Sequence, residues 1–483
     1  MTTRAELHRK QRSWTAESLE KVPKPVLVVS GLHLLYAALI VPAGSLGYDA
    51  KISLFAFLSA MTLWAATRLP AGYVALSLVL FIILMKAGEP DLLYQSMAEP
   101  VVWLMIGAFV IGEAFTRSGL ADRLTHSALR RFEKKGSLLN ALTALLFATS
   151  FFIPSTSGRA ALARPILNQL GNRFSPRERQ VLSVLAPSVI LMSTSATLLG
   201  AGSHLIGIGL LETASGQSIS FVRWLVWGVP FAAAATVVTV AAIRLTMWPK
   251  RESEASVPED SLPAPQTPEK MSDPEKRTLL LISVMLLGWM TDGLHGYGIA
   301  FVTMAGAALA MVPGYGILSF KDGIRSVSWN LILFVAAATA LGTALIQTGV
   351  VSVAEEKLSG LLLAAGQAPE WLLVLILAAV SVSSHLYITS HTTRAVVLVP
   401  TLIVTAKSIG ADPAAAVFLG LIGMNYCLTM PVSSKALLLF YEEGDGSFSA
   451  RDLAKLSSLL APAYIAIMVL FYFTYWKWTG LGL

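Results

Sequence analysis

The sequence has a single cysteine and few charged residues, and both shortages restrict what the protein can be. Because Cys427 is the only cysteine, the chain forms no internal disulfide and holds no cysteine-based metal centre. Charged residues make up 13% of the 483 positions, against about 25% in soluble globular proteins. Hydrophobic residues supply 55% and the mean hydropathy is +0.65. This composition indicates an all-α protein that crosses a lipid bilayer several times.

The amino terminus also lacks the parts of a secretion signal. Residues 1–24 are polar and basic, without an apolar core or a small-residue cleavage site, so we expect them to remain as a cytoplasmic tail. The net charge of the chain is +7, but its Lys and Arg residues fall mainly in short loops between apolar segments. Basic residues at such places set the orientation of membrane spans, and we therefore expect no nucleic-acid partner.

A short hydroxyl-rich motif occurs twice in the chain. The first copy reads STSGR at residues 155–159, and the second reads SHTTR at residues 390–394. In both copies the Arg lies four residues after the first Ser, and a Pro, Pro165 or Pro400, lies ten residues after it. This spacing predicts an internal repeat.

Each motif lies between two apolar arms that are short for a membrane span. The arms are Leu138 to Ile153 and Ala160 to Leu170 around the first copy, and Trp371 to Leu386 and Ala395 to Ala406 around the second. As helices they would extend over roughly 16–24 Å, whereas the hydrocarbon layer is about 30 Å thick. Basic residues flank both ends of the first segment, so it enters and leaves on the cytoplasmic side. We predict two re-entrant helical hairpins, at residues 137–171 and 371–407.

The tip of such a hairpin is suited to hold an anion. The break in the helix frees backbone N–H groups, which need partners in protein or in a water-filled cavity. Ser, Thr and Gly cap the following helix, whose amino terminus carries partial positive charge. Arg159 and Arg394 add full positive charges at the same places. We therefore predict that an anion is held between the two tips near the bilayer midplane, and we favour a charge of −2 or more.

The remaining sequence predicts two halves of opposite orientation. Residues 25–248 form the first half and residues 278–483 the second, with a Pro-rich cytoplasmic linker at 249–277 between them. After each hairpin, an apolar stretch (Val181 to Leu211, and Ala415 to Phe440) is interrupted by small polar residues, which indicates a broken helix that lines a cavity. We count about eleven transmembrane helices besides the hairpins. The second hairpin then enters from the outside, so that the halves are inverted-topology repeats.

This order of elements resembles the divalent anion:sodium symporter family, whose members carry dicarboxylates, citrate and sulfate. The resemblance extends over residues 25–480. Family members read Ser-Asn-Thr at each tip with Leu-Pro shortly after it, and the tips here read STS at 155–157 and SHT at 390–392. The resemblance implies an inner-membrane homodimer in which a hairpin-bearing transport domain moves like an elevator.

The resemblance also implies which residues contact the substrate. The broken-span motifs of the family are similar to residues 197–204 and 430–437, which adds Ser434 and Lys435 to the two tips. The expected substrate site comprises Ser155, Thr156, Ser157, Arg159, Ser390, His391, Thr392, Arg394, Ser434 and Lys435. We expect His391 to contact substrate, with proton coupling as the alternative role.

The sodium ligands that the family uses are only partly present. Ser155, Thr156 and Gly200 form the candidate sodium site, but Thr156 stands where the family has Asn. Phe151 and Leu386 stand where a Ser or Thr four residues before the tip Ser is expected. Because the nearby Arg and Lys side chains raise the cost of binding sodium, we expect sodium dependence to be weakened or lost.

Two other classes of function compete with an anion carrier. A cation/proton antiporter of the same superfamily is the alternative, but it requires carboxylates at the midplane, and the hairpins and broken spans contain none. Glu113 lies within a predicted span, near its cytoplasmic end. An intramembrane enzyme would require a motif such as His-Glu-x-x-His, which is absent. A C4-dicarboxylate, sulfate, a sulfonated carboxylate and citrate all fit as substrates.

Overall fold

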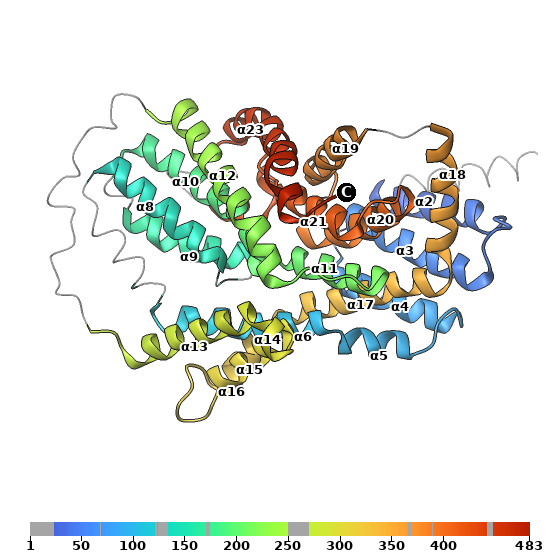
Figure 1. Ribbon diagram of the computed structural model, residues 1–483, viewed down its shortest axis with the longest axis horizontal. Helices are drawn as coiled ribbons and strands as arrows, with labels where there is room; N and C mark the ends of the chain where they lie inside the picture. The colour runs from blue at the N-terminus through green and yellow to red at the C-terminus, as the bar shows by residue number, and fades with distance from the viewer. Residues whose placement is uncertain are drawn as a thin grey trace, which may run out of the picture.

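The computed structural model is helical throughout the part of the chain that it describes (Figure 1). The residues described are 24–67, 69–120, 123, 134–151, 153, 155–170, 174–249, 270–365, 369–388, 390–441 and 448–483. No strand occurs among them, which confirms the predicted all-α class. The predicted tail, residues 1–24, lies outside the described residues except for Lys24.

The helices before the predicted linker are α2 (Lys24–Ile40), α3 (Tyr48–Ala66), α4 (Ala71–Leu84), α5 (Asp91–Ala98), α6 (Pro100–Arg117), α8 (Lys135–Ala148), α9 (Thr156–Leu170), α10 (Pro176–Ser193), α11 (Gly202–Ser215) and α12 (Phe221–Thr246). Three short turns of 3-10 helix are η1 (Thr149–Phe151), η3 (Thr194–Ala196) and η4 (Leu198–Gly200).

The helices after the linker are α13 (Asp273–Met290), α14 (Asp292–His295), α15 (Ile299–Ala310), α16 (Phe320–Ser326), α17 (Trp329–Gln347), α18 (Val350–Ala365), α19 (Glu370–Ser383), α20 (His391–Ser408), α21 (Pro413–Met424), α22 (Lys435–Tyr441) and α23 (Ala450–Phe471). The 3-10 turns η6 (Ser384–Leu386) and η7 (Pro431–Ser433) interrupt this half, and η8 (Tyr472–Trp476) and η9 (Lys477–Thr479) extend α23.

Four helical segments of the described chain are long and apolar enough to cross a membrane by themselves. They are α6, α12, α17 and the continuous segment Ala450–Thr479. Other apolar helices, such as α4, α15 and α21, are shorter. The segments agree with a multi-pass membrane protein, while the total of about eleven spans stays a prediction.

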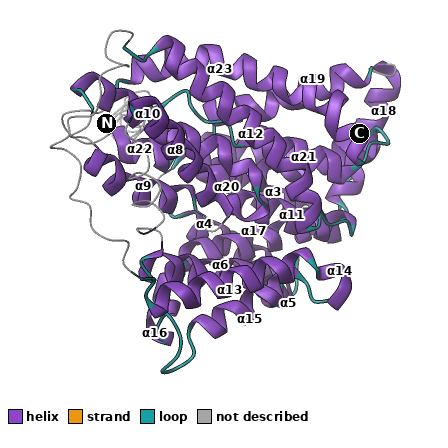
Figure 2. Ribbon diagram, turned by 60° about the vertical axis from the view of Figure 1, so that its left-hand side comes forward, coloured by secondary structure: helices purple, strands orange, loops and turns teal. Residues whose placement is uncertain are grey.

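The helices are arranged on two sides of a buried centre. In both views α13, α15 and α16 lie at the bottom with α6, opposite α19 and α23 at the top (Figures 1 and 2). On the upper side, α12 and α19 pack against α23. Nearly every residue of α21 is buried, and so is every residue of α10 from Val184 to Ser193. These two helices end where the two broken spans are interrupted, so both interruptions lie in the interior.

One order of elements occurs twice. A helix pair at the first predicted hairpin (α8, η1 and α9), which we continue to call a hairpin, is followed by an interrupted segment (α10, η3, η4 and α11) and a long helix (α12). The second occurrence is α19, η6 and α20, then α21, η7 and α22, then α23. The two sets interlock, because α9 packs against α22 and α20 packs against α11. Each hairpin is therefore held by the broken span of the other half.

Helix α13 begins inside the stretch that composition assigns to the linker. Helix α13 begins at Asp273, within the stretch 249–277, because Ser272 and Glu275 form a capping box. Arg123 donates a hydrogen bond to Glu275 Oε1 at 2.6 Å. That bond, aided by those from Ser272, lowers the pKa of Glu275 to about 2. The start of this helix is polar, and composition alone assigns it to the linker.

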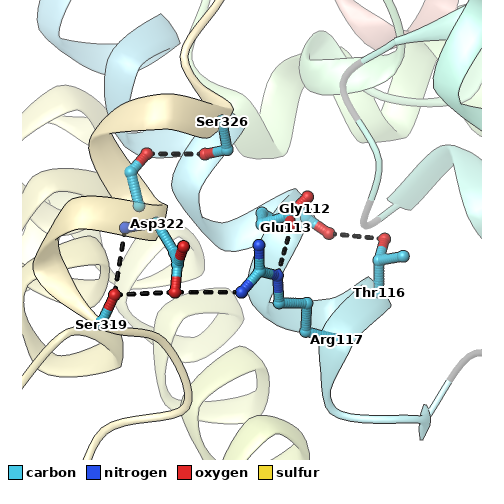
Figure 3. A network of polar contacts seen from close by, with 8 residues as sticks. Gly112, Glu113, Thr116, Arg117, Ser319, Asp322 and Ser326 are labelled. Carbon is cyan, nitrogen blue, oxygen red and sulfur yellow. Dashed lines mark hydrogen bonds and ion pairs between the residues drawn. The ribbon is translucent and has the colours of Figure 1, made fainter.

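A network of polar contacts joins α6 to α16 at the end of α6 (Figure 3). Arg117 contacts Glu113 Oε1 at 2.6 Å and Asp322 Oδ2 at 3.0 Å. Ser319 caps α16 by accepting a hydrogen bond from the backbone N–H of Asp322. Glu113, the acid expected near a cytoplasmic helix end, is thus paired on this partly exposed edge.

Candidate anion-binding site

The first Ser of each repeated motif creates the helix start that the motif was predicted to contain. Ser155 Oγ accepts a hydrogen bond from the Gly158 N–H at 3.2 Å, just before α9. Ser390 Oγ accepts one from the Thr393 N–H at 3.3 Å and is the N-cap of α20. These caps satisfy backbone donors that a break in the helix would leave unpaired. We call residues 155–157 the first tip and residues 390–392 the second tip.

Arg159, one turn into α9, is completely buried and fully engaged with protein oxygens. Its Nε donates to Thr149 Oγ1 at 2.9 Å and its Nη2 to the Leu146 carbonyl at 3.0 Å. Nη2 also donates to Ser193 Oγ, and Nη1 lies 3.4 Å from Thr194 Oγ1. The guanidinium therefore joins the first arm of its own hairpin to the broken span behind it.

Arg394, at the matching position of α20, is equally buried but much less engaged. Its Nη1 donates to the Met424 carbonyl at 2.5 Å and lies 3.4 Å from the Tyr426 carbonyl. Its Nε and Nη2 have no hydrogen-bond acceptor among the described residues, although the weakly accepting Cys427 thiol lies beside the guanidinium. Two strong donors of a buried cation thus remain available.

The Cys427 thiol is the point at which three of the predicted site residues meet. His391 Nε2 lies 3.1 Å from Cys427 Sγ, and the side chains of Arg394 and Ser434 also contact this thiol. The His391 Nδ1 atom is buried and has no partner within the described chain, and the same holds for Ser433 Oγ. The second tip and the residues around η7 therefore contain several buried polar atoms that have no hydrogen-bond partner among the described residues.

A hydrogen-bonded bridge connects the two broken spans at the centre. His204 Nδ1 lies 3.1 Å from the Thr197 carbonyl, and its Nε2 lies 2.8 Å from Asn425 Nδ2. Asn425 Nδ2 is also 2.9 Å from Ser195 Oγ. Thr197 Oγ1 donates to the Ser150 carbonyl of the first hairpin at 2.8 Å. Arg159 contacts Ser193 and Thr194, which directly precede Ser195, and Arg394 contacts the carbonyls of Met424 and Tyr426, which flank Asn425. Both cations therefore adjoin the ends of this bridge.

The other predicted site residues lie at different depths. Ser434 is buried, and its Oγ accepts a hydrogen bond from the Ala436 N–H at 3.2 Å. Thr156 and Ser157 are half-buried at the start of α9, and Thr392 lies beside Gly202, the first residue of α11. Ser390 and Lys435 are exposed. The structure therefore gathers His391, Arg394 and Ser434 around Cys427 and places Lys435 outside that buried region.

One candidate sodium ligand, Gly200, lies against a residue that Arg159 contacts. Gly200 lies against the Thr194 carbonyl so closely that a Cβ atom would stand 2.1 Å from that oxygen. Only Gly fits there, and the same Thr194 receives Arg159 through its hydroxyl. Ser155 holds the helix start one turn before Arg159. Two of the three candidate sodium ligands, Ser155 and Gly200, thus lie near the contacts of Arg159.

Sequence reasoning missed Asn425, Ser193 and Thr194 as site residues. Asn425 is the amide that directly follows the apolar helix α21, and a polar residue at that boundary was the signal that could have identified it. Ser193 and Thr194 were recognised as an interruption of an apolar stretch, but not as partners of Arg159. Their distance of 34 and 35 positions from Arg159 carries no sequence pattern.

Comparison with known proteins yields a family and a fold. The family model described as the sodium:sulfate symporter transmembrane region matches residues 26–481. A "Membrane protein" of Cupriavidus necator is 27% identical over 399 residues, covering 78% of this chain and 74% of that protein. The L-tartrate/succinate antiporter of Escherichia coli K12 is 23% identical over 396 residues, covering 77% and 78%.

A solved structure has a similar fold. It is that of the Alcanivorax borkumensis YdaH transporter, with a TM-score of 0.57 and 16% identity, and the similarity covers 95% of this chain and all of that one. Together with the family match over almost the whole sequence, the interrupted helices and the two tips lead to one conclusion: the chain belongs to the sodium:sulfate symporter family, the divalent anion:sodium symporters, and is a membrane transporter of anions.

Proposed function

We propose that the protein carries a small anion of charge −2 or more, with a C4-dicarboxylate as the favoured substrate, across the inner membrane in exchange for a second anion. The anion is held at the two tips, mainly by Arg394, His391 and Ser434. Arg159 takes the place that sodium has in other family members, so that transport does not depend on sodium.

The observation that carries this proposal is the pair of unused donors on Arg394. A buried polar group without a partner costs about 1–3 kcal/mol, and more if it is charged. A carboxylate accepts two parallel N–H bonds from a guanidinium and would supply the missing partners. The unpaired Nδ1 of His391 adds one further contact at the same tip. A substrate with two carboxylates fits this surplus of donors.

The surroundings of Arg159 support the absence of a sodium requirement. Its partners are the carbonyl of Leu146 and the hydroxyls of Thr149, Ser193 and Thr194. Carbonyl and hydroxyl oxygens at broken helices are the ligands with which transporters hold sodium. A guanidinium in that position supplies a permanent positive charge, and no ion has to bind before the anion can.

Exchange is supported by the relatives, and the pairing of Glu113 gives no support to the cation/proton antiporter alternative. The relative in Escherichia coli is named an L-tartrate/succinate antiporter, which favours C4-dicarboxylates as both substrates. Glu113 is paired with Arg117 on a partly exposed edge of the molecule, away from the tips. A cation/proton antiporter therefore has no support from this acid.

The proposal includes the movement and assembly that the family resemblance implies. We expect inverted-topology halves, a cytoplasmic amino terminus, a homodimer and an elevator movement of the hairpins. Lys435 and Ser390 are exposed in this conformation. We expect them, with Ser155, Thr156, Ser157 and Thr392, to approach the anion when the tips close around it.

The test is transport by the purified protein in liposomes loaded with unlabelled succinate or with buffer. We expect labelled succinate to enter only the loaded liposomes, at the same rate in sodium chloride and in choline chloride. Steep activation by sodium would overturn sodium independence, and entry into liposomes without internal anion would overturn exchange. Sulfate and citrate as competitors would show whether two carboxylates at C4 spacing are preferred.

A further inference from the structure

A cavity of about 620 Å³ lies between α8 and α12, outside the anion site. Both helices also pack against α10. The walls are largely apolar and include Ala144, Phe147, Ala233 and Val240. A volume of this size falls in the range of about 300–1,000 Å³ that is typical of small-molecule sites.

The rim of the cavity shows which medium it opens to. Val237 and Leu245, which line the cavity, are 66% and 80% exposed. Large apolar side chains of a membrane protein are exposed in this way where they face hydrocarbon rather than water. The cavity therefore opens sideways into the bilayer, where the molecules available to fill it are lipids.

One end of the cavity carries a charge without a counter-charge. Arg244, in the last turn of α12, donates to Asn140 Oδ1 at 2.7 Å and to the Gly136 carbonyl at 3.4 Å, both of them neutral acceptors. No carboxylate of the described chain forms an ion pair with it. An anionic group at the membrane surface would complement this guanidinium.

The distance between the charged and apolar ends matches one lipid leaflet. Ala233 and Arg244 are eleven positions apart on one helix, which is about 16 Å at 1.5 Å per residue. Half of a hydrocarbon layer of about 30 Å is about 15 Å. An acyl chain along α12 would thus end near Ala233 while its phosphate lies at Arg244.

We propose that this cavity is a binding site for one anionic phospholipid, with its phosphate on Arg244 and an acyl chain between α8 and α12. The lipid covers the first arm of the hairpin that carries Arg159. It therefore supports the hairpin from the side opposite to the broken span. The site is independent of the substrate, because it lies on the other face of α8.

The experiment measures lipids that remain bound to the delipidated protein, by native mass spectrometry, after addition of phosphatidylglycerol or phosphatidylcholine with identical acyl chains. We expect one molecule of phosphatidylglycerol to bind about fivefold more tightly than phosphatidylcholine, which corresponds to about 1 kcal/mol for one cation at the surface. Arg244→Gln should remove this preference. Arg223→Gln, at the opposite end of α12, is the matched control and should keep it.

Two variants that fill the cavity from different walls, Ala144→Phe and Ala241→Phe, separate the acyl-chain site from general attraction to charge. Both should reduce binding of both lipids, and having two variants covers the failure of either one to fold. The proposal is overturned if both folded variants bind lipid like the wild type, or if Arg223→Gln has the effect expected of Arg244→Gln. Displacement of the lipid by soluble glycerophosphate would show a free-anion site instead. Loss of dimer in the filled variants, without any bound lipid, would identify a second copy of the chain as the occupant.

Discussion

Arg159 and Arg394 occupy the same position in two matching hairpins, yet their surroundings differ. Arg159 has four oxygen partners, distributed over its own hairpin and the broken span next to it. Arg394 has two carbonyl partners on a single nitrogen and leaves two other nitrogens without an oxygen acceptor among the described residues. Both side chains are completely buried.

The difference indicates that the two cations have separate duties. A guanidinium with all its nitrogens satisfied has little left to offer a substrate and acts as part of the framework. A buried guanidinium with unused donors binds an anion strongly, because a low-dielectric interior strengthens such bonds. The two halves of the chain thus share an order of elements, and under the proposed function the first provides a built-in cation while the second provides the anion contact.

The largest effect is expected for Arg394→Gln. Truncation of one partner of a buried charge pair costs about 2–5 kcal/mol, so transport of labelled succinate should fall at least about thirtyfold. Succinate should also lose its ability to raise the unfolding temperature of the protein. If this variant transports succinate like the wild type while Arg159→Gln does not, the assignment of duties to the two halves is reversed.

Arg159→Ser should mainly reduce stability, by about 2–4 kcal/mol, because several hydrogen bonds to a buried charged group are lost. The vacated oxygens form a set suited to sodium, and bound sodium stabilises the folded state by mass action. We therefore expect the unfolding temperature to rise in sodium chloride but not in choline chloride. Arg394→Ser is the control, with no sodium-specific rise expected. Equal behaviour in both salts would contradict a cation site at Arg159.

Asn425→Ala tests the bridge that joins the two regions. It removes the amide bonds to His204 and Ser195 in the buried centre, so we expect a loss of about 1–2 kcal/mol in the free energy of unfolding. Asn140→Ala, on the exposed face of α8, should change stability by less than about 0.5 kcal/mol. Chemical denaturation in detergent measures both. An equally small effect at Asn425 would mean that the halves are not coupled through this contact.

The smallest effect is expected at the start of α13, where the ion pair of Glu275 and Arg123 depends on pH. The pKa of Glu275 is lowered from 4.5 to about 2, chiefly by its hydrogen bond from Arg123. Because the folded-state pKa is depressed, the contribution to stability is complete above pH 4.5 and is lost as the pH falls toward 2. Unfolding temperatures measured across that interval should fall more steeply for the wild type than for Glu275→Gln. Parallel pH curves for the wild type and the variant would show that this ion pair contributes nothing to stability.

The interrupted helices were predictable because their signals are local. A Ser that caps a helix and an Arg one turn later mark both hairpin tips, and the structure starts α9 at Thr156 and α20 at His391. The break after Ser193 occurs at polar residues within an apolar run, as predicted, whereas α21 already ends at Met424, before the polar stretch 429–435 where the second break was expected. Each of these features depends on residues within a few positions of one another, so periodicity and capping rules apply to them.

The distribution of partners was not predictable, because it depends on contacts between distant residues. Arg159 and Arg394 occupy equivalent positions in the repeated motif. Yet Arg159 binds the hydroxyls of Ser193 and Thr194, whereas Arg394 binds the carbonyl of Met424. Lys435 resembles a site residue in sequence and is exposed in the structure. The bridge between His204 and Asn425 joins residues that are 221 positions apart.

The interlocking of the halves has a consequence for synthesis. Helix α9 ends at Leu170, and its packing partner α22 begins at Lys435, which is 435 − 170 = 265 residues later. At about 5–20 residues per second, the ribosome needs roughly 13–53 s to supply that partner. During this time the newly synthesised first hairpin lies in the membrane without α22, the helix it packs against. A chain that stops in the linker never completes it, and both parts of the gene product have to be made before either hairpin is secured.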